Sequence, residues 1–133
     1  MQLDLRVLPD LLSICRLAPG TYLPADTLTG ALWSVTSTTD ELSLVCAREA
    51  LPAGVAAGPD WRAVRVAGTL DFGLTGILSS LATPLAEAEV PIFAVSTFDT
   101  DYVLVPDRLL EVAVRALGSA GHRISELADP TAP

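Results

Sequence analysis

One short stretch between two apolar runs concentrates side chains that carry hydroxyl or carboxylate oxygens. Its polar members are Ser96, Thr97, Asp99, Thr100 and Asp101. Oxygens of this kind accept hydrogen bonds from an ammonium group, and the hydroxyls can also donate. The same residue types stabilise turns by bonding to their own backbone without any ligand. The spacing therefore supports two interpretations, a docking place for a small polar molecule and turn chemistry alone.

A second polar stretch precedes a helical pattern. It consists of Asp71, Phe72, Gly73, Leu74, Thr75, Gly76 and Ile77. The first turn of a helix presents unpaired N–H groups and a partial positive charge, which suit a carboxylate. The two glycines permit close approach to the backbone. In the competing interpretation, Asp71 only caps a helix that starts at Gly73 or Leu74, and Phe72 and Phe98 fill the core.

Together the two stretches predict a pocket for a free amino acid, which carries a carboxylate and an ammonium a short distance apart. The helix start would receive the carboxylate, and Asp99 or Asp101 would receive the ammonium. Two carboxylates without a histidine or a third acid make a weak metal site, so we expect no metal and no cofactor. No nucleophile-and-base set occurs, and we expect no catalytic residue and no enzymatic activity. His122, the only histidine, is expected to be solvated in a loop.

The elements that must position these residues follow from periodicity. Runs at 91–95 and 102–105 are rich in β-branched and aromatic residues and predict a hairpin around the polar turn. Apolar residues from Leu74 to Ala88 fall on one helical face, with a bend or break expected at Pro84. A second helical stripe runs from Leu110 to Leu117, and 121–127 predicts a last short strand.

The order from residue 61 onwards is strand, helix, strand, strand, helix, strand. This is the ferredoxin-like βαββαβ arrangement, an antiparallel sheet with both helices on one face. The first half is rich in strand patterns and has no convincing helix. We therefore expect an α+β protein with a β-rich unit at 1–60, a second unit at 61–127 and a disordered tail at 128–133.

Composition limits the partners. The chain has 133 residues, a formal net charge of −8 and no lysine. An acidic chain without a basic stripe argues against nucleic acid or an anionic membrane as partner. The high apolar content predicts a second buried surface, most simply in a homodimer. The start of the chain does not resemble a signal peptide, and Cys15 and Cys46 are expected to be buried free thiols of a cytoplasmic protein.

The hairpin sequence from Ile92 to Val105 and the stretch from Leu70 to Leu78 resemble the ACT-domain family. Within it, they look like the bacterial CASTOR-like proteins related to the cytosolic arginine sensor and to the regulatory part of aspartate kinases. The resemblance covers residues 61–126, and it implies two ACT-like units in tandem, the first diverged. The turn signature is present as Thr97, Phe98 and Asp101. Leu74 stands where the resemblance would place a carboxylate, which leaves a ligand with a cationic side chain in question.

The resemblance implies a regulatory protein that binds an amino acid or a similar small metabolite and acts on a partner protein. The alternative is an interaction module that has lost its pocket and works by dimerisation or docking. Stabilisation by added ligand separates the two interpretations.

Overall fold

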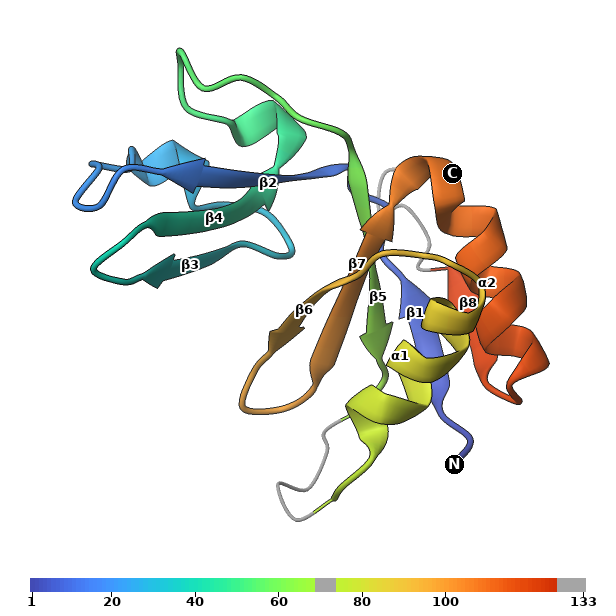
Figure 1. Cartoon of the computed structure of the whole chain (residues 1–133). Coiled ribbons are helices and arrows are strands. Elements are labelled where there is room, and N and C mark those ends of the chain that lie inside the picture. Colours follow the sequence, from blue (N-terminus) through green and yellow to red (C-terminus); the bar gives the residue numbers. More distant parts are fainter. Residues whose placement is uncertain (69–73, 127–133) are drawn as a thin grey trace. The chain divides into compact units, whose positions relative to one another are not determined.

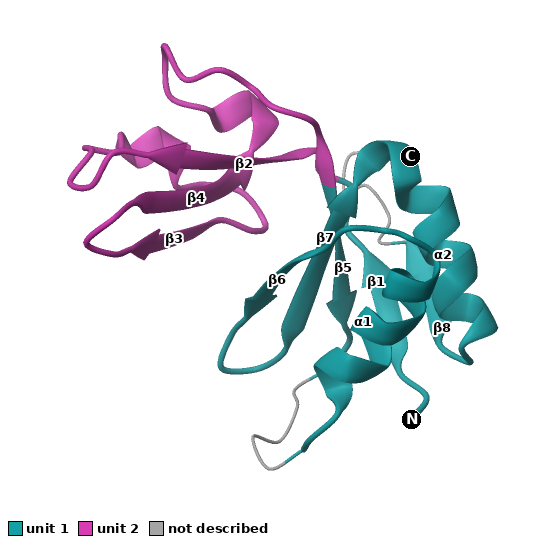
Figure 2. Cartoon of the chain, viewed as in Figure 1, with its two compact units in different colours: residues 1–9, 62–133 teal, residues 10–61 magenta. Residues whose placement is uncertain are grey.

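The computed structural model describes residues 1–68 and 74–126. The chain forms two compact units, one from Met1–Pro9 with Arg62–Pro133 and the other from Asp10–Trp61 (Figure 2). The second of these units ends at Trp61. The first nine residues, however, group with the C-terminal part, because their strand pairs there.

Unit 1 has the α+β architecture that the sequence predicts (Figure 1). Its elements are β1 (Asp4–Val7), β5 (Trp61–Val66), α1 (Ile77–Glu87), β6 (Phe93–Ser96), β7 (Asp101–Pro106), η3 (Asp107–Leu109), α2 (Leu110–Ser119) and β8 (Arg123–Glu126). From β5 onwards the order is βαββαβ. The sheet order is β8-β1-β5-β7-β6.

Strand β1 is the addition to this pattern. It is antiparallel to β5, with Leu5 opposite Val66, and parallel to β8, with Leu5 beside Ile124. It therefore lies between the first and last strands of the βαββαβ series. Hairpin β6–β7 is antiparallel, as expected, and pairs Ser96 with Asp101.

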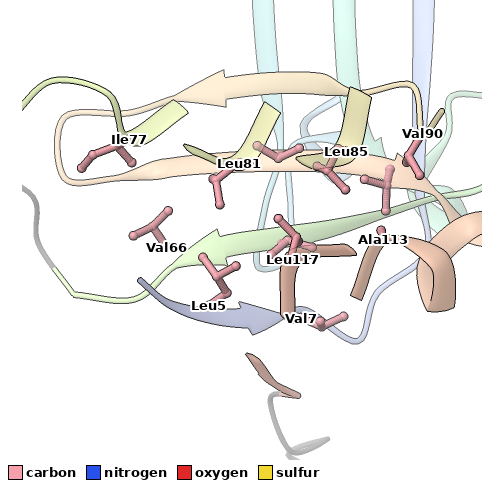
Figure 3. Packing of buried hydrophobic residues seen from close by; sticks show 12 residues of the cluster. Leu5, Val7, Val66, Ile77, Leu81, Leu85, Val90, Ala113 and Leu117 are labelled. Carbon is pink, nitrogen blue, oxygen red and sulfur yellow. The ribbon is translucent and has the colours of Figure 1, made fainter. Parts of the chain in front are cut away.

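One face of this sheet carries the core of unit 1. Alternate residues of β1, β5 and β7 contact the buried faces of the two helices, as strand geometry requires. The cluster contains Leu5, Val7, Val64, Val66, Val103, Val105, Leu81, Leu85, Ala113 and Leu117, each no more than 1% exposed. Figure 3 shows labelled members from strands and helices turned towards one another. Both helices thus cover the same face. The opposite face carries polar residues such as Arg6 and Arg65, and also the buried apolar residues Ala63 and Leu104.

Helix α1 differs from the sequence-based expectation at its start. It begins at Ile77 rather than at Gly73 or Leu74, because Gly76 adopts a left-handed conformation with φ +81° and ψ +1° that a right-handed helix cannot include. Leu74 therefore lies outside the helix and is 51% exposed.

Of the bend or break expected at Pro84, the break is absent, since α1 continues to Glu87. Pro84 removes only one N–H donor, and the carbonyl left open, that of Ser80, is engaged by His122 at 3.1 Å. The expectation of a solvated His122 is wrong: the side chain is 6% exposed and is hydrogen-bonded on both ring nitrogens.

Unit 2 is built from three antiparallel strands in the order β3-β4-β2. They are β2 (Leu12–Leu17), β3 (Ser34–Ser37) and β4 (Leu42–Ala47), with short 3-10 turns at η1 (Ala25–Thr27) and η2 (Arg48–Ala50). No α-helix occurs within residues 10–61, all of which are described. The β-rich character expected for this part of the chain is thus confirmed.

The core of unit 2 is formed around Cys15, Leu44 and Cys46. Both cysteines are buried free thiols, as expected. Burial raises the pKa of each thiol, and the neighbouring Cys15 adds to the increase in the pKa of Cys46. Across the described parts of the chain, none of the helices has the length and apolar character that a bilayer crossing requires.

Candidate functional site

The β6–β7 turn and the start of α1 lie at the same end of unit 1 (Figure 1). The Thr100 hydroxyl donates a hydrogen bond of 2.6 Å to the carbonyl of Val66, the last residue of β5. Thr100 is 4% exposed, so this bond is shielded from water. The bond links the polar turn to the end of β5, the strand that precedes Gly76 and α1 in the sequence. The two candidate stretches are therefore brought to one end of the sheet, as far as they are described.

Within the turn, the threonine hydroxyls are used by the protein itself. The Thr97 N–H donates to the Thr100 carbonyl at 2.8 Å. The Thr97 hydroxyl donates to the same carbonyl at 3.1 Å and accepts from the Thr100 N–H at 3.2 Å. This is the local Ser/Thr turn bonding that the sequence left as an alternative. Thr97 and Thr100 thus shape the turn and have less capacity left for a ligand.

The carboxylates are differently placed. The Ser96 hydroxyl donates to Oδ1 of Asp101 at 2.6 Å. Asp101 alternates with Val103 and Val105, which belong to the core, so it points to the helix-covered face. Asp99 is exposed at the tip of the turn. Asp101 is therefore an oriented carboxylate on the side of the sheet where α1 begins.

The start of α1 supplies donors. Its N-cap, Gly76, makes no side-chain capping bond, and the Ser80 N–H already bonds to the Gly76 carbonyl at 2.9 Å. By helix geometry, the N–H groups of Ile77, Leu78 and Ser79 have no acceptor within the helix. The sequence-based site includes Ile77 but omits Leu78 and Ser79. Only the left-handed conformation of Gly76, which sets the helix start, would have identified them.

Exposed apolar side chains belong to the same turn and to the start of α1. Phe98 is 77% exposed, so the interpretation of Phe98 as a core residue is wrong. Leu74 and Leu78 are 51% and 36% exposed. The remaining predicted site residues fall in two groups: Thr75 is exposed, while Asp71, Phe72 and Gly73 lie outside the described residues.

The two stretches offer groups of opposite character. N–H groups of a helix start suit a carboxylate, and the Asp101 carboxylate suits an ammonium. Among residues 1–68 and 74–126, no group of three or more His, Cys, Asp or Glu side chains could hold a metal ion.

Comparison with known proteins identifies the class. A family model for the ACT domain matches residues 56–119, and a second model, for an N-terminal domain, matches residues 10–54. The protein Atu0741 from Agobacterium tumefaciens has a crystal structure that is 35% identical, with a TM-score of 0.89 over 97% of this chain and 96% of that one. Residues 56–119 thus match the ACT domain, and the chain as a whole belongs to the same family as Atu0741. This confirms the ACT resemblance inferred from the hairpin and the upstream loop.

More distant relatives share parts of the chain or only its fold. The human cytosolic arginine sensor for mTORC1 subunit 1 is 43% identical over 51 residues, which are 38% of this chain and 16% of that protein. The match thus spans a small part of that relative. The regulatory subunit of aspartate kinase from Thermus flavus aligns with a TM-score of 0.61 at 14% identity, over 90% of this chain and 99% of that one. That likeness shows a shared fold.

Proposed function

We propose that this protein is a non-catalytic regulatory protein that binds an amino acid or a similar small zwitterion at the α1 end of unit 1. The ligand carboxylate would meet the N–H groups of Ile77, Leu78 and Ser79, and the ammonium would meet Asp101. The observation that carries the proposal is the Thr100–Val66 hydrogen bond, which places the acidic turn beside the end of β5. The likeness to an arginine sensor and to a kinase regulatory subunit supports the same role.

The proposal extends to the assembly. We infer a homodimer that acts on a partner protein in the cytoplasm, without a cofactor and without nucleic acid or membrane as partner. Residues 10–60 would form a diverged ACT-like unit in tandem with the ACT domain. The apolar content of the chain and the acidic net charge of −8 support these assignments.

Thermal-shift measurements with each of the twenty amino acids at millimolar concentration test the proposed function. A ligand at a hundredfold excess over Kd stabilises the folded state by about 2.7 kcal/mol. Any amino acid that raises the melting temperature is then titrated by calorimetry. The proposal fails if none of the twenty shifts the transition.

A variant locates the site. Asp101→Asn removes the charge that would pair with the ammonium, and a charge-assisted bond is worth about 1.5–3 kcal/mol, so Kd should rise by about ten- to a hundredfold. Asp26→Asn is the matched control, because Asp26 is an exposed acid of η1 in unit 2. Equal loss in both variants would place the ligand elsewhere.

A second function, an interaction module without a ligand, is favoured by the exposed apolar side chains Phe98, Leu74 and Leu78. Exposed apolar surface of sufficient area marks sites of protein contact. In that case no amino acid stabilises the chain, and Phe98→Ser lowers self-association or partner capture in light-scattering experiments.

A further inference from the structure

Two arginines stand directly opposite each other on the sheet face that the helices leave uncovered. Arg6 of β1 and Arg65 of β5 are paired in the antiparallel ladder. Their sequence neighbours Leu5, Val7 and Val66 point into the core, so both arginines point the other way. Directly opposed residues on one face have Cβ atoms about 4.5–5.5 Å apart. Two guanidinium groups are thus held within reach of one small anion.

The surrounding strands do not neutralise this pair. Beside Arg6, the register places Ser125 of β8, which is uncharged. The nearest acid along β1 is Asp4, and its carboxylate is engaged by Arg123 at 2.7 Å. None of the ion pairs among the described residues includes Arg6 or Arg65. Like charges in directly opposed positions destabilise a sheet, so an anion between them would relieve a cost built into the fold.

Arg65 contacts β7, the strand on the other side of β5 from Arg6. Its guanidinium carbon lies 5.9 Å from the centre of the Tyr102 ring, a cation–π distance. Its Nε is buried and makes no hydrogen bond in the described structure. A buried donor without an acceptor is costly, and stacking on the ring limits the freedom of the planar group. The donor is therefore available in a defined orientation.

A cavity accompanies Arg6 on the neighbouring strands. It has a volume of about 290 Å³ and is lined by Asp4, Leu5, Arg6, Ala67, Arg123, Ile124 and Ser125. Arg65 is not among the lining residues, and the one acid among them, Asp4, is paired with Arg123. The space accommodates a small organic acid or a phosphate, and both guanidinium and hydroxyl groups are suitable donors for such oxyanions.

We propose that Arg6, with Ser125 as an additional donor, binds a small oxyanion at this cavity on the open face of unit 1, and that Arg65 adds a second positive charge from the directly opposed position. The planar guanidinium groups suit carboxylate and phosphate oxygens, which they can bind in a bidentate manner. This site lies on the opposite face of the sheet from Asp101. It is independent of the proposed zwitterion pocket, and either could exist without the other.

Titration of the full chain with inorganic phosphate and, separately, with acetate tests the proposal, at constant ionic strength and monitored by calorimetry. We expect saturable binding of at least one of them, and its identity distinguishes a phosphate ligand from a carboxylate ligand. Arg6→Gln should weaken binding at least tenfold, because it removes one of the two charges. Arg6 is exposed, so this variant should fold.

Arg108→Gln is the matched control, because Arg108 is an exposed arginine of η3 in the same unit. It should bind the anion as the unaltered chain does. Tyr102→Leu, which removes the ring beneath Arg65, should weaken binding to a smaller extent. Absence of saturable binding of both anions overturns the proposal, as does equal binding by the Arg6→Gln and unaltered proteins. Amino-acid binding measured on the same Arg6→Gln protein should be unchanged, which separates this test from that of the zwitterion pocket.

Discussion

His122 donates a hydrogen bond from its Nε2 to the main-chain carbonyl of Ser80, the carbonyl that Pro84 leaves without a helical donor. The Leu3 N–H donates to the other ring nitrogen, Nδ1, at 3.1 Å, so Nδ1 carries no proton and Nε2 must carry one. One neutral imidazole thus completes α1 and also holds the start of β1. The proline and the histidine compensate for each other across the core of unit 1.

Replacing the histidine should expose this dependence. His122→Phe keeps an aromatic ring but leaves the Leu3 N–H and the Ser80 carbonyl without partners in a buried place. Each such loss costs about 1–3 kcal/mol, so for the two groups we expect a destabilisation of about 2–6 kcal/mol in urea unfolding. Pro84→Ala restores a helical donor to Ser80. In the double variant the cost of His122→Phe should fall, with a coupling energy of about 0.5–3 kcal/mol. Strict additivity of the two changes would contradict the compensation.

The Thr100–Val66 bond should hold the turn against the end of β5. Thr100→Val keeps the shape of the side chain and removes the buried donor, so the free energy of unfolding should fall by about 1–3 kcal/mol. Thr97→Val is the control, because Thr97 is exposed and water can replace its bonds, and a surface change of this kind stays within about 0.5 kcal/mol. Equal losses of unfolding free energy in the two variants would show that the hydrogen bond to Val66 does not stabilise the protein more than the exposed turn bonds do.

Gly76 should be sensitive to any side chain. Its φ of +81° costs an L-residue about 1–2 kcal/mol, although a Cβ there would meet no atom within 4 Å. Gly76→Ala should therefore destabilise the protein by about 1 kcal/mol, because the stiffer unfolded chain offsets part of the strain. Gly118 lies inside α2 without a positive φ, so Gly118→Ala should stabilise it by about 0.5–1 kcal/mol. Thermal unfolding of the pair gives the comparison, and a stabilising Gly76→Ala would refute the prediction.

The two buried thiols predict a loss of stability at alkaline pH. Burial raises the pKa of Cys15 and Cys46 above the ordinary value of 9.0 in the folded state. The unfolded chain therefore loses these protons first. The thiols make their full contribution to the free energy of unfolding below pH 9.0. That contribution declines as the pH rises from 9.0 towards the pKa values of the thiols in the folded state.

Unfolding free energies measured from neutral pH to above 9.0 test whether stability falls as the pH rises. A Cys15→Ala/Cys46→Ala protein should have a lower free energy of unfolding at neutral pH, because it loses buried volume. Its free energy of unfolding should fall less steeply as the pH rises. The difference between the two proteins should narrow with rising pH. A constant difference would mean that the thiols do not contribute to the pH dependence.

Local patterns were sufficient for much of unit 1. The hairpin around the polar turn, the two helices and the order of elements follow from periodicities of 2 and 3.6 and from turn residues. The pairing of β1 does not, because an alternating strand such as 4–7 has no feature in its own residues that specifies which strands it joins. Register is decided by distant partners, here Val66 and Ile124.

The details of the candidate site depend on similar non-local facts. Gly76 can adopt either sign of φ, so the sequence alone does not fix the first residue of α1 to within one helical turn. The position of Thr100 against Val66 and that of His122 against Ser80 join residues 34 and 42 positions apart. Polar residue types indicated where a ligand could dock. Which of their atoms remain available was decided by tertiary hydrogen bonds.

The pairing of β1 with β8 also determines the order in which the two units can form during synthesis. The Leu3 N–H reaches the ring of His122 across 119 positions of sequence, so the ACT unit cannot close until nearly all of the described chain has left the ribosome. Residues 10–61 emerge as one uninterrupted segment and can fold while translation continues. Residues 1–9 have no strand partner until then, and an unpaired strand edge can pair wrongly.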